Sequence, residues 1–134
     1  MQQQDRDGLA FFQTADGNPA SYSAAARVGD LIYTAGQIGA EVGGPPVDVG
    51  EQVRTALSRL IAAVEAAGGG VETIVKINTY LADLNDFPLY DQIYRELVAV
   101  DPKPARTSVQ IAAFPAPLKI EIDAVASIRD VEAK

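Results

Sequence analysis

Two charged side chains in the last third of the sequence have the chemistry to bind and activate a small anionic substrate. Arg106 follows a proline and an alanine at the start of a predicted strand. Its guanidinium is a planar fork of donors that fits a carboxylate bidentately. Glu121 lies between two isoleucines in an alternating strand, where it could orient a water molecule or act as a base. A surface salt bridge for Arg106 and a solvated strand face for Glu121 remain the commoner roles of such residues.

A second set of candidates lies nearer the N-terminus. The segment 34–37 ends a predicted strand with Ala35 and Gly36, and a glycine there lets the backbone approach a ligand and donate its N–H groups. Tyr22 could place a phenol over a pocket. A plain turn and ordinary amphipathic packing explain these residues equally well at this stage.

The residue types that are absent limit the chemistry. The chain has no cysteine and no histidine, which excludes Ser–His and Cys–His catalysis and makes a zinc site a poor match. The glycine run 68–70 follows a predicted helix rather than a strand, so it predicts a helix stop and not a phosphate-binding loop. We therefore expect no metal and no cofactor.

Length and charge narrow the class of protein further. A chain of 134 residues fits one domain, 1–134. The net charge of −7 disfavours general nucleic-acid binding, although it allows one local positive site for a small anion. The N-terminus is polar, and no apolar run approaches the ~20 residues needed to span a bilayer. The sequence thus predicts a cytoplasmic protein without membrane association.

The strands and helices that must position these candidates are predicted from the spacing of apolar residues and from the glycine, proline, asparagine and aspartate residues that end them. Strands are expected at 10–14, 23–28 and 31–35, with a turn at 16–19 and a two-residue hairpin turn at Gly29-Asp30. An apolar stripe beginning after the N-cap Asp48 predicts a helix that ends at 68–70. A strand at 74–81, a helix at 86–98 capped by Asn85, and strands at 106–111 and 119–128 follow. Residues 1–8 are polar and expected to be frayed.

The order β-β-β-α-β-α-β-β predicts a single α+β domain, a mixed sheet with two helices on one face. Two helices cover only one face of such a sheet. The other face also carries apolar residues and needs a partner surface, so we expect self-association.

Taken together, these segments resemble the Rid family, also called the YjgF family, from about Tyr22 to Ala126. The strongest pieces are PARTSV at 104–109 and KIEIDAVA at 119–126. Supporting pieces are VGDLIYTAGQI at 28–38, AVEAAG at 63–68 and LADLNDF at 81–87. The resemblance implies a chorismate-mutase-like fold and a homotrimer with sites in the clefts between subunits. It also implies cofactor-free hydrolysis of imines and enamines such as 2-aminoacrylate, releasing a keto acid and ammonia.

The resemblance also assigns roles to individual positions. Arg106 matches the arginine that binds the substrate carboxylate, and Glu121 matches the glutamate that orients or activates the water. Tyr22 matches a tyrosine that lines the site, and Gly36 a glycine whose backbone contacts the ligand.

Four positions depart from the familiar deaminase pattern. Ala35 stands where a serine is common, and Asp91 where an asparagine often lies. Ser108 replaces a frequent cysteine, and Thr107 a frequent serine. The first two changes remove a ligand hydrogen bond and add a negative charge near a carboxylate pocket, so they bear on the substrate.

Three functions remain open on the sequence. The first is an imine/enamine deaminase of the 2-iminobutanoate/2-iminopropanoate type. The second is a non-catalytic, regulatory trimer that binds a small carboxylate, which Ala35 and Asp91 favour. The third is a specialised catabolic deaminase on the same fold. A nuclease is disfavoured by the acidic charge and the missing histidine.

Overall fold

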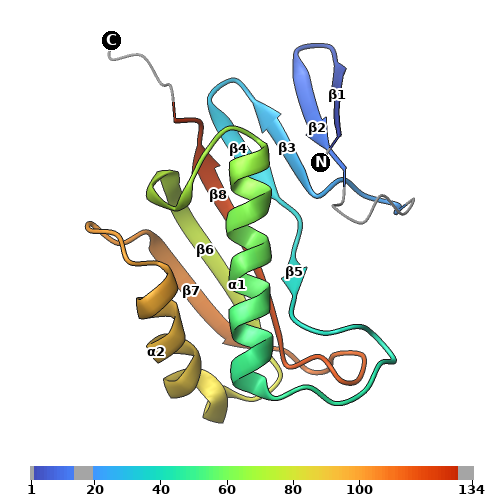
Figure 1. The fold of residues 1–134 in the computed structure, drawn as a ribbon, viewed down its shortest axis with the longest axis vertical. Coiled ribbons are helices and arrows are strands. Elements are labelled where there is room, and N and C mark those ends of the chain that lie inside the picture. The colour runs from blue at the N-terminus through green and yellow to red at the C-terminus, as the bar shows by residue number, and fades with distance from the viewer. Residues whose placement is uncertain (1, 14–19, 130–134) are drawn as a thin grey trace.

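Eight β-strands and two α-helices make up the described part of the chain, residues 2–13 and 20–129, in a computed structural model (Figure 1). In chain order the elements are β1 (Gln3–Arg6), β2 (Leu9–Phe12), β3 (Ala25–Val28), β4 (Leu31–Thr34), β5 (Gln37–Ile38), α1 (Val49–Ala66), β6 (Ile74–Leu81), α2 (Phe87–Leu97), β7 (Ala105–Gln110) and β8 (Ile120–Ser127). Two 3-10 turns, η1 (Val71–Thr73) and η2 (Leu84–Asp86), precede β6 and α2.

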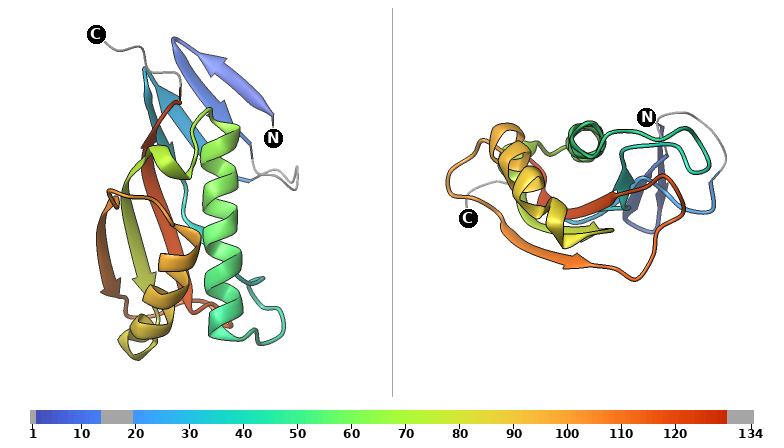
Figure 2. Two further views of the ribbon diagram at one scale, coloured as in Figure 1. Left: turned by 60° about the vertical axis from the view of Figure 1, so that its left-hand side comes forward. Right: turned by 90° about the horizontal axis from the view of Figure 1, so that it is seen from below.

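All strands belong to one mixed sheet. The order is β1-β2-β3-β4-β8-β6-β7, and β5 pairs with β8 beside this path. Among the described strands, only β6 and β7 pair in parallel, because α2 provides the crossover that a parallel pair needs. Both helices lie on the same side of the sheet (Figure 2). The predicted α+β class, with a mixed sheet and two helices on one face, is confirmed.

The structure adds two short strands to the predicted order. Residues 3–6, expected to be frayed, form β1, which pairs with β2 through a turn at Asp7 and Gly8. The segment 37–38 forms β5, which is too short for its alternation to be recognised in the sequence. The turn predicted at 16–19 lies outside the described residues.

The helix caps follow the predictions at one helix and differ at the other. The Asp48 carboxylate accepts a hydrogen bond from the Gly50 N–H at 3.1 Å, as expected for the N-cap of α1. The helix ends at Ala66, and after the C-cap Ala67 comes Gly68, whose φ of 106° suits a residue without a side chain. Before α2, however, Asp83 rather than Asn85 provides the capping carboxylate, and its bond to the Asn85 N–H starts the 3-10 turn. The prediction of Asn85 as the cap was therefore wrong.

The two faces of the sheet have different characters, because successive side chains of a strand point to opposite sides. In β8, Ile120, Ile122, Ala124 and Ala126 are buried in the core beneath the helices. The alternate residues of β8, beginning with Glu121, form what we call the open face. This face also carries large apolar side chains of the other strands that are exposed: Val28, Leu31, Tyr33 and Val109.

Candidate functional site

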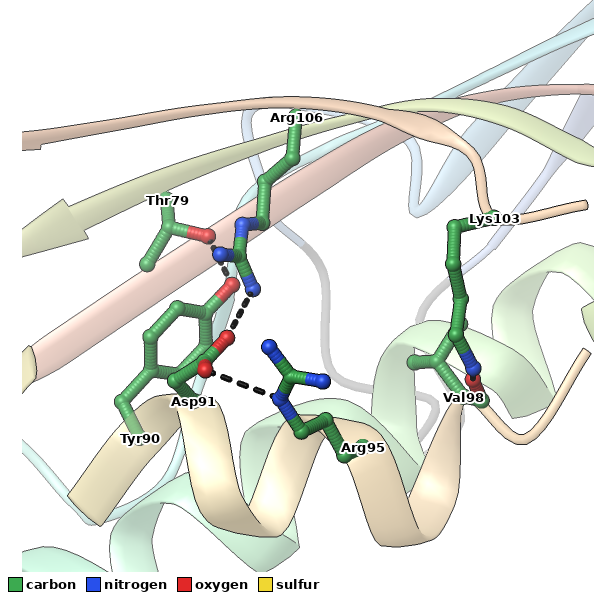
Figure 3. A network of polar contacts seen from close by, with 7 residues as sticks. All are labelled: Thr79, Tyr90, Asp91, Arg95, Val98, Lys103 and Arg106. Carbon is green, nitrogen blue, oxygen red and sulfur yellow. Dashed lines mark hydrogen bonds and ion pairs between the residues drawn. The ribbon is translucent and has the colours of Figure 1, made fainter. Parts of the chain in front are cut away.

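Arg106 lies on the helix-covered face of the sheet, held between β7 and α2 (Figure 3). Its Nη1 donates to the Asp91 carboxylate at 2.8 Å. The guanidinium carbon lies 4.6 Å from the ring centre of Tyr94, 5.5 Å from that of Tyr90 and 5.3 Å from that of Phe87. Three aromatic faces and one carboxylate thus fix the position of this cation.

The spacing of the aromatic residues on α2 explains why they meet Arg106. Phe87, Tyr90 and Tyr94 recur at helical intervals, so they share one side of the helix. The Tyr90 hydroxyl is hydrogen-bonded to Thr79 of β6, which fixes the ring against the sheet. Burial raises the pKa of Tyr90, so its phenol stays neutral at physiological pH.

Asp91 contacts two arginines at once. Its Oδ2 accepts a hydrogen bond from Arg95 Nε at 3.0 Å, while Oδ1 accepts the bond from Arg106. The hydrogen bonds from Arg95 and then from Arg106 lower the pKa of Asp91. Burial alone would lower the pKa of Arg106, but the bond to Asp91 leads the opposing effects and the pKa rises. Both groups are therefore charged over the whole physiological pH range.

A cavity of about 260 Å³ opens beside this ion pair. Its volume is sufficient for a ligand of a few carbon atoms. Lys103, which also faces it, donates from Nζ to the Val98 carbonyl at 3.0 Å. Its lining therefore combines cations, one carboxylate and one phenol: Asp91, Tyr94, Arg95, Lys103, Pro104 and Arg106.

Glu121 lies on the open face, next to Gly36. A Cβ at residue 36 would collide with the Glu121 carboxylate, so the glycine leaves the space that this side chain occupies. Burial, and secondly the charge of Asp123, raise the pKa of Glu121. The proximity of Gly36 and Glu121 arises because β5 pairs with β8 at Ile38 and Glu121. This arrangement provides a carboxyl group that binds a proton more readily than an ordinary glutamate does.

Next to Glu121, the open face holds a polar network that the sequence did not reveal. Asp123 accepts hydrogen bonds from the Asn78 amide at 2.8 Å and from the Tyr80 hydroxyl at 3.0 Å. Burial, followed by the bond to Asp123, raises the pKa of Tyr80. The network depends on the register between β6 and β8, which pairs Asn78 with Asp123 and Tyr80 with Glu121. Alternation within one strand indicates which of its residues share a face, but not which residue of a neighbouring strand each of them pairs with.

Arg106 and Glu121 point from opposite faces of the same sheet. Arg106 pairs with Ile77 across β6 and β7, and Ile77 is buried beneath the helices. Glu121 pairs with Tyr80, on the alternate set of β6 residues. Since paired residues of neighbouring strands share a face, the two predicted catalytic side chains are separated by the sheet. A single copy of the chain therefore does not bring them together at one substrate.

The remaining predicted site residues lie in three different places. Ser108 shares the face of Arg106, and its Oγ is buried without a hydrogen-bond partner among the described residues. Ala35 lies between β4 and β5, where its N–H donates to Ala24 at 2.8 Å. Tyr22 lies in the connection before β3 and is 59% exposed. Neither Ala35 nor Tyr22 lines the cavity beside Arg106.

Arg95 and Lys103, which line the cavity, were not predicted from the sequence, and neither was the contact of the α2 aromatic residues with Arg106. The signal for that contact was present in part, because an aromatic helix face opposite a strand that begins with arginine suits cation–π contact. Within residues 2–13 and 20–129, no cluster of three or more carboxylates is placed to hold a metal ion. No helix of that part is long and apolar enough to cross a membrane.

Comparison with known proteins supplies an independent set of observations. Residues 14–128 match the family model described as Endoribonuclease L-PSP. TdcF of Escherichia coli K12, whose name describes a reactive intermediate deaminase, is 35% identical over 118 residues, covering 85% of this chain and 92% of TdcF. The 2-iminobutanoate/2-iminopropanoate deaminase of Dermatophagoides farinae is 33% identical over 110 residues, covering 80% of this chain and 85% of that protein.

Solved structures agree with the sequence matches. The crystal structure of E. coli TdcF with bound serine has a TM-score of 0.73 and 34% identity, covering 83% of this chain and 91% of that one. A Vibrio vulnificus structure, whose name suggests a translation initiation inhibitor, has a TM-score of 0.76 and 34% identity, covering 87% of this chain and 98% of that one. Similar chains thus carry names that describe different activities.

Proposed function

Because the chain belongs to the Rid family, also called the YjgF family, we propose that it hydrolyses reactive imines and enamines that carry a carboxylate. The products are a 2-keto acid and ammonia. The observation that carries the proposal is Arg106, an arginine fixed by aromatic rings at the wall of a cavity large enough for a small carboxylate. Two relatives named as deaminases, and one solved with bound serine, support a small ligand of this kind.

The proposed reaction needs few protein groups. An iminium carbon is already electrophilic, so water adds to it, the nitrogen takes a proton, and ammonia leaves as the carbonyl forms. Arg106 anchors the carboxylate and fixes the direction in which the carbon faces. Glu121, with its raised pKa, orients the water and accepts its proton. Orientation alone supplies several kcal/mol in such reactions, so the proposed mechanism requires neither a metal nor an organic cofactor.

The separation of Arg106 and Glu121 by the sheet favours a site shared between subunits. One copy contributes Arg106 from its helix-covered face, and a neighbouring copy contributes Glu121 and Gly36 from its open face. A head-to-tail contact of this kind gives a ring when its rotation closes, and we propose closure after three copies, the homotrimer expected from the sequence. The exposed apolar side chains of the open face, Val28, Leu31, Tyr33 and Val109, would be buried in such an assembly.

Other positions complete the proposed site. Ser108 offers a hydroxyl beside Arg106, and Tyr22, Ala35 and Gly36 approach the substrate from the copy that supplies Glu121. The exposure of Tyr22 in one chain fits a residue that acquires its contacts from a neighbour.

The direct test is an assay with 2-aminoacrylate or short-chain imines generated enzymatically in the cuvette. Keto acid should appear faster than in the uncatalysed control, and extensive chelator treatment should leave the rate unchanged. A rate equal to that of the control for every imine tested would reject the deaminase. A large loss with chelator, restored by one metal, would reject the cofactor-free mechanism alone.

A second candidate is a regulatory trimer that binds small carboxylates without turnover. The observation that favours it is the Asp91–Arg106 ion pair, because the anchoring cation already has a counter-charge. Binding of a keto acid without acceleration of imine hydrolysis would identify this case. The Endoribonuclease L-PSP description of the family does not lead us to propose a nuclease, since the net charge is −7 and repels a phosphate backbone.

A further inference from the structure

The cation that lines the cavity is one half of a fixed ion pair. Asp91 contacts Arg106 through Nη1 only, at 2.8 Å, so the guanidinium is bound at one nitrogen and not across its fork. Both groups also line the cavity. A ligand that enters next to Arg106 therefore meets a negative charge beside the positive one.

The position of Asp91 is fixed by more than its contact with Arg106. Its second oxygen accepts a hydrogen bond from Arg95 at 3.0 Å, and its side chain is only 22% exposed. The rings of Tyr90 and Tyr94 restrain the guanidinium from the other side. Figure 3 shows Asp91 between Arg95 and Arg106. Because both partners of the ion pair are restrained, a small ligand does not displace the carboxylate easily, and Asp91 stays next to a ligand bound at Arg106.

Two classes of small carboxylate respond differently to this pair of charges. A monoanion is attracted by Arg106 and repelled by Asp91, so at similar distances the contribution of this ion pair largely cancels. A zwitterion with a cationic nitrogen next to its carboxylate is attracted by both charges. Lys103 and Arg95, which also line the cavity, attract the carboxylate of either ligand and repel a cationic nitrogen. Among the described lining residues, Asp91 is therefore the one whose charge favours the zwitterion over the monoanion.

We propose that Asp91 is a specificity-determining residue that makes the cavity prefer zwitterionic ligands to monoanions of the same shape. The carboxylate of the ligand lies at Arg106 and its cationic nitrogen at Asp91. The identity of the natural ligand rests on the proposed function: it is the protonated 2-imino acid, which carries a carboxylate and an iminium. The charge preference itself does not depend on turnover.

This preference has a consequence for the reaction. Water adds to the iminium carbon and ammonia leaves with the proton, which converts the zwitterion into a monoanionic keto acid. The product has lost the charge that Asp91 attracts, so it binds less tightly than the substrate. Asp91 thereby favours the more electrophilic, protonated substrate and the release of the product.

The experiment compares L-serine with L-glycerate, which has a hydroxyl where serine has an ammonium. Dissociation constants are measured by NMR titration for the wild-type protein and for Asp91→Asn and Asp91→Ser. Glu96→Gln is the matched control, because Glu96 is an acidic residue of the same helix that pairs with Arg54 instead. Thermal melting checks that each variant is folded.

The wild-type protein should bind serine more tightly than glycerate. Asp91→Asn should shift the ratio of the two constants toward glycerate by at least tenfold, which corresponds to about 1.4 kcal/mol, and Asp91→Ser should shift it in the same direction. Glu96→Gln should leave the ratio within about twofold of the wild-type value. An unchanged ratio in folded Asp91→Asn, or an equal shift in Glu96→Gln, overturns the proposal.

The outcome separates this inference from the proposed function. A protein that shows the shifted ratio but never accelerates imine hydrolysis retains Asp91 as the selector of zwitterions and loses the deaminase. If the protein hydrolyses imines but Asp91→Asn and Asp91→Ser have the wild-type ratio of serine and glycerate dissociation constants, the deaminase is retained and the role of Asp91 is rejected. If neither ligand binds the wild-type protein at concentrations up to about 100 mM, the assignment of zwitterions to this cavity is wrong.

Discussion

The two faces of the sheet are built from the same strands but carry different groups. On the helix-covered face, Arg106 is fixed by aromatic rings and by Asp91, beside a closely packed apolar core. On the open face, Glu121 and the Asp123 network lie among exposed apolar side chains such as Tyr33. On the helix-covered face, contacts within the same chain fix the charged group. The open face still exposes apolar surface that a partner could bury.

The short strand β7 contributes side chains to both faces of the sheet. In β7, Arg106 and Ser108 point toward α2, while Thr107 and Val109 point the other way. A binding residue and an interface residue can thus be adjacent in the sequence. Neighbouring substitutions in this strand should accordingly have unrelated effects, and this can be tested one residue at a time.

The largest loss of activity is expected from substitution of Arg106, on the helix-covered face. Arg106→Ala should lower kcat/KM for a 2-imino acid by about 1000-fold or more, because the substrate loses charge-assisted hydrogen bonds and its orientation toward the water. Single-turnover hydrolysis measures this loss. Arg106→Lys should recover little, since a point charge does not reproduce the fork. Normal hydrolysis by Arg106→Ala would show that the cavity beside α2 is not the site.

The next effect concerns the open face as an interface. Tyr33→Glu puts a charge on a side chain that is 46% exposed in one chain, and we expect it to dissociate the trimer and remove activity. Light scattering should change from about three times the chain mass of 14.1 kDa to one times that mass.

Val42→Glu is the matched control, because Val42 is similarly exposed, at 55%, but lies in the loop between β5 and α1 and belongs neither to the open face nor to the lining of the cavity. It should leave the trimer intact. A wild-type protein that is a clean monomer at micromolar concentration would contradict both the trimer and the shared site.

A smaller effect is expected at Glu121. Glu121→Gln retains the shape of the side chain and removes its charge, so kcat should fall about 100-fold while binding of an unreactive keto acid is retained. Stopped-flow hydrolysis and a binding titration measure the two quantities. An unchanged kcat would leave Arg106 as the anchor and remove Glu121 from the mechanism.

The stability of the same variant should depend on pH in a defined direction. Since the pKa of Glu121 is raised in the folded protein, its protonated form stabilises the fold at low pH, and this contribution is lost as the pH rises through the folded pKa. Glu121→Gln removes the ionised, partly buried carboxylate. Its melting temperature relative to the wild type should therefore be higher at about pH 7 than at about pH 4.

The smallest effect is expected at Ser108. Its Oγ is buried without a hydrogen-bond partner among residues 2–13 and 20–129, so Ser108→Ala should change the free energy of unfolding by less than about 1 kcal/mol. If the hydroxyl contacts the substrate, KM should rise a fewfold with the melting temperature unchanged. A loss of several kcal/mol on chemical denaturation would instead assign Ser108 to the packing of β7.

The fold was largely predictable because the apolar residues of each long strand or helix recur at the spacing typical of that element. The alternation in 119–128 separates the buried isoleucines from Glu121, and the stripe of α1 begins at its cap Asp48. Short elements lack that redundancy: β5 has two residues and could not be recognised. The hairpin with β1 was missed because all of its first strand is polar and exposed.

The candidate site was predictable only as separate residues. The sequence indicated Arg106 and Glu121, but the face on which each lies depends on the pairing of β6 with β7 and β8. The Asp91–Arg106 ion pair joins a helix to a strand and follows from the crossover between β6 and β7. Such contacts are tertiary, so neither residue spacing nor composition determines them.

The opposite orientation of Arg106 and Glu121 makes an unusual genetic result possible: two inactive proteins should restore each other. When Arg106→Ala and Glu121→Gln subunits are mixed in equal amounts and reassembled at random, about one site in four receives the intact arginine from one subunit and the intact glutamate from its neighbour. Co-expression should then return about a quarter of the wild-type rate. Two alleles, each defective alone, would complement within a single assembly.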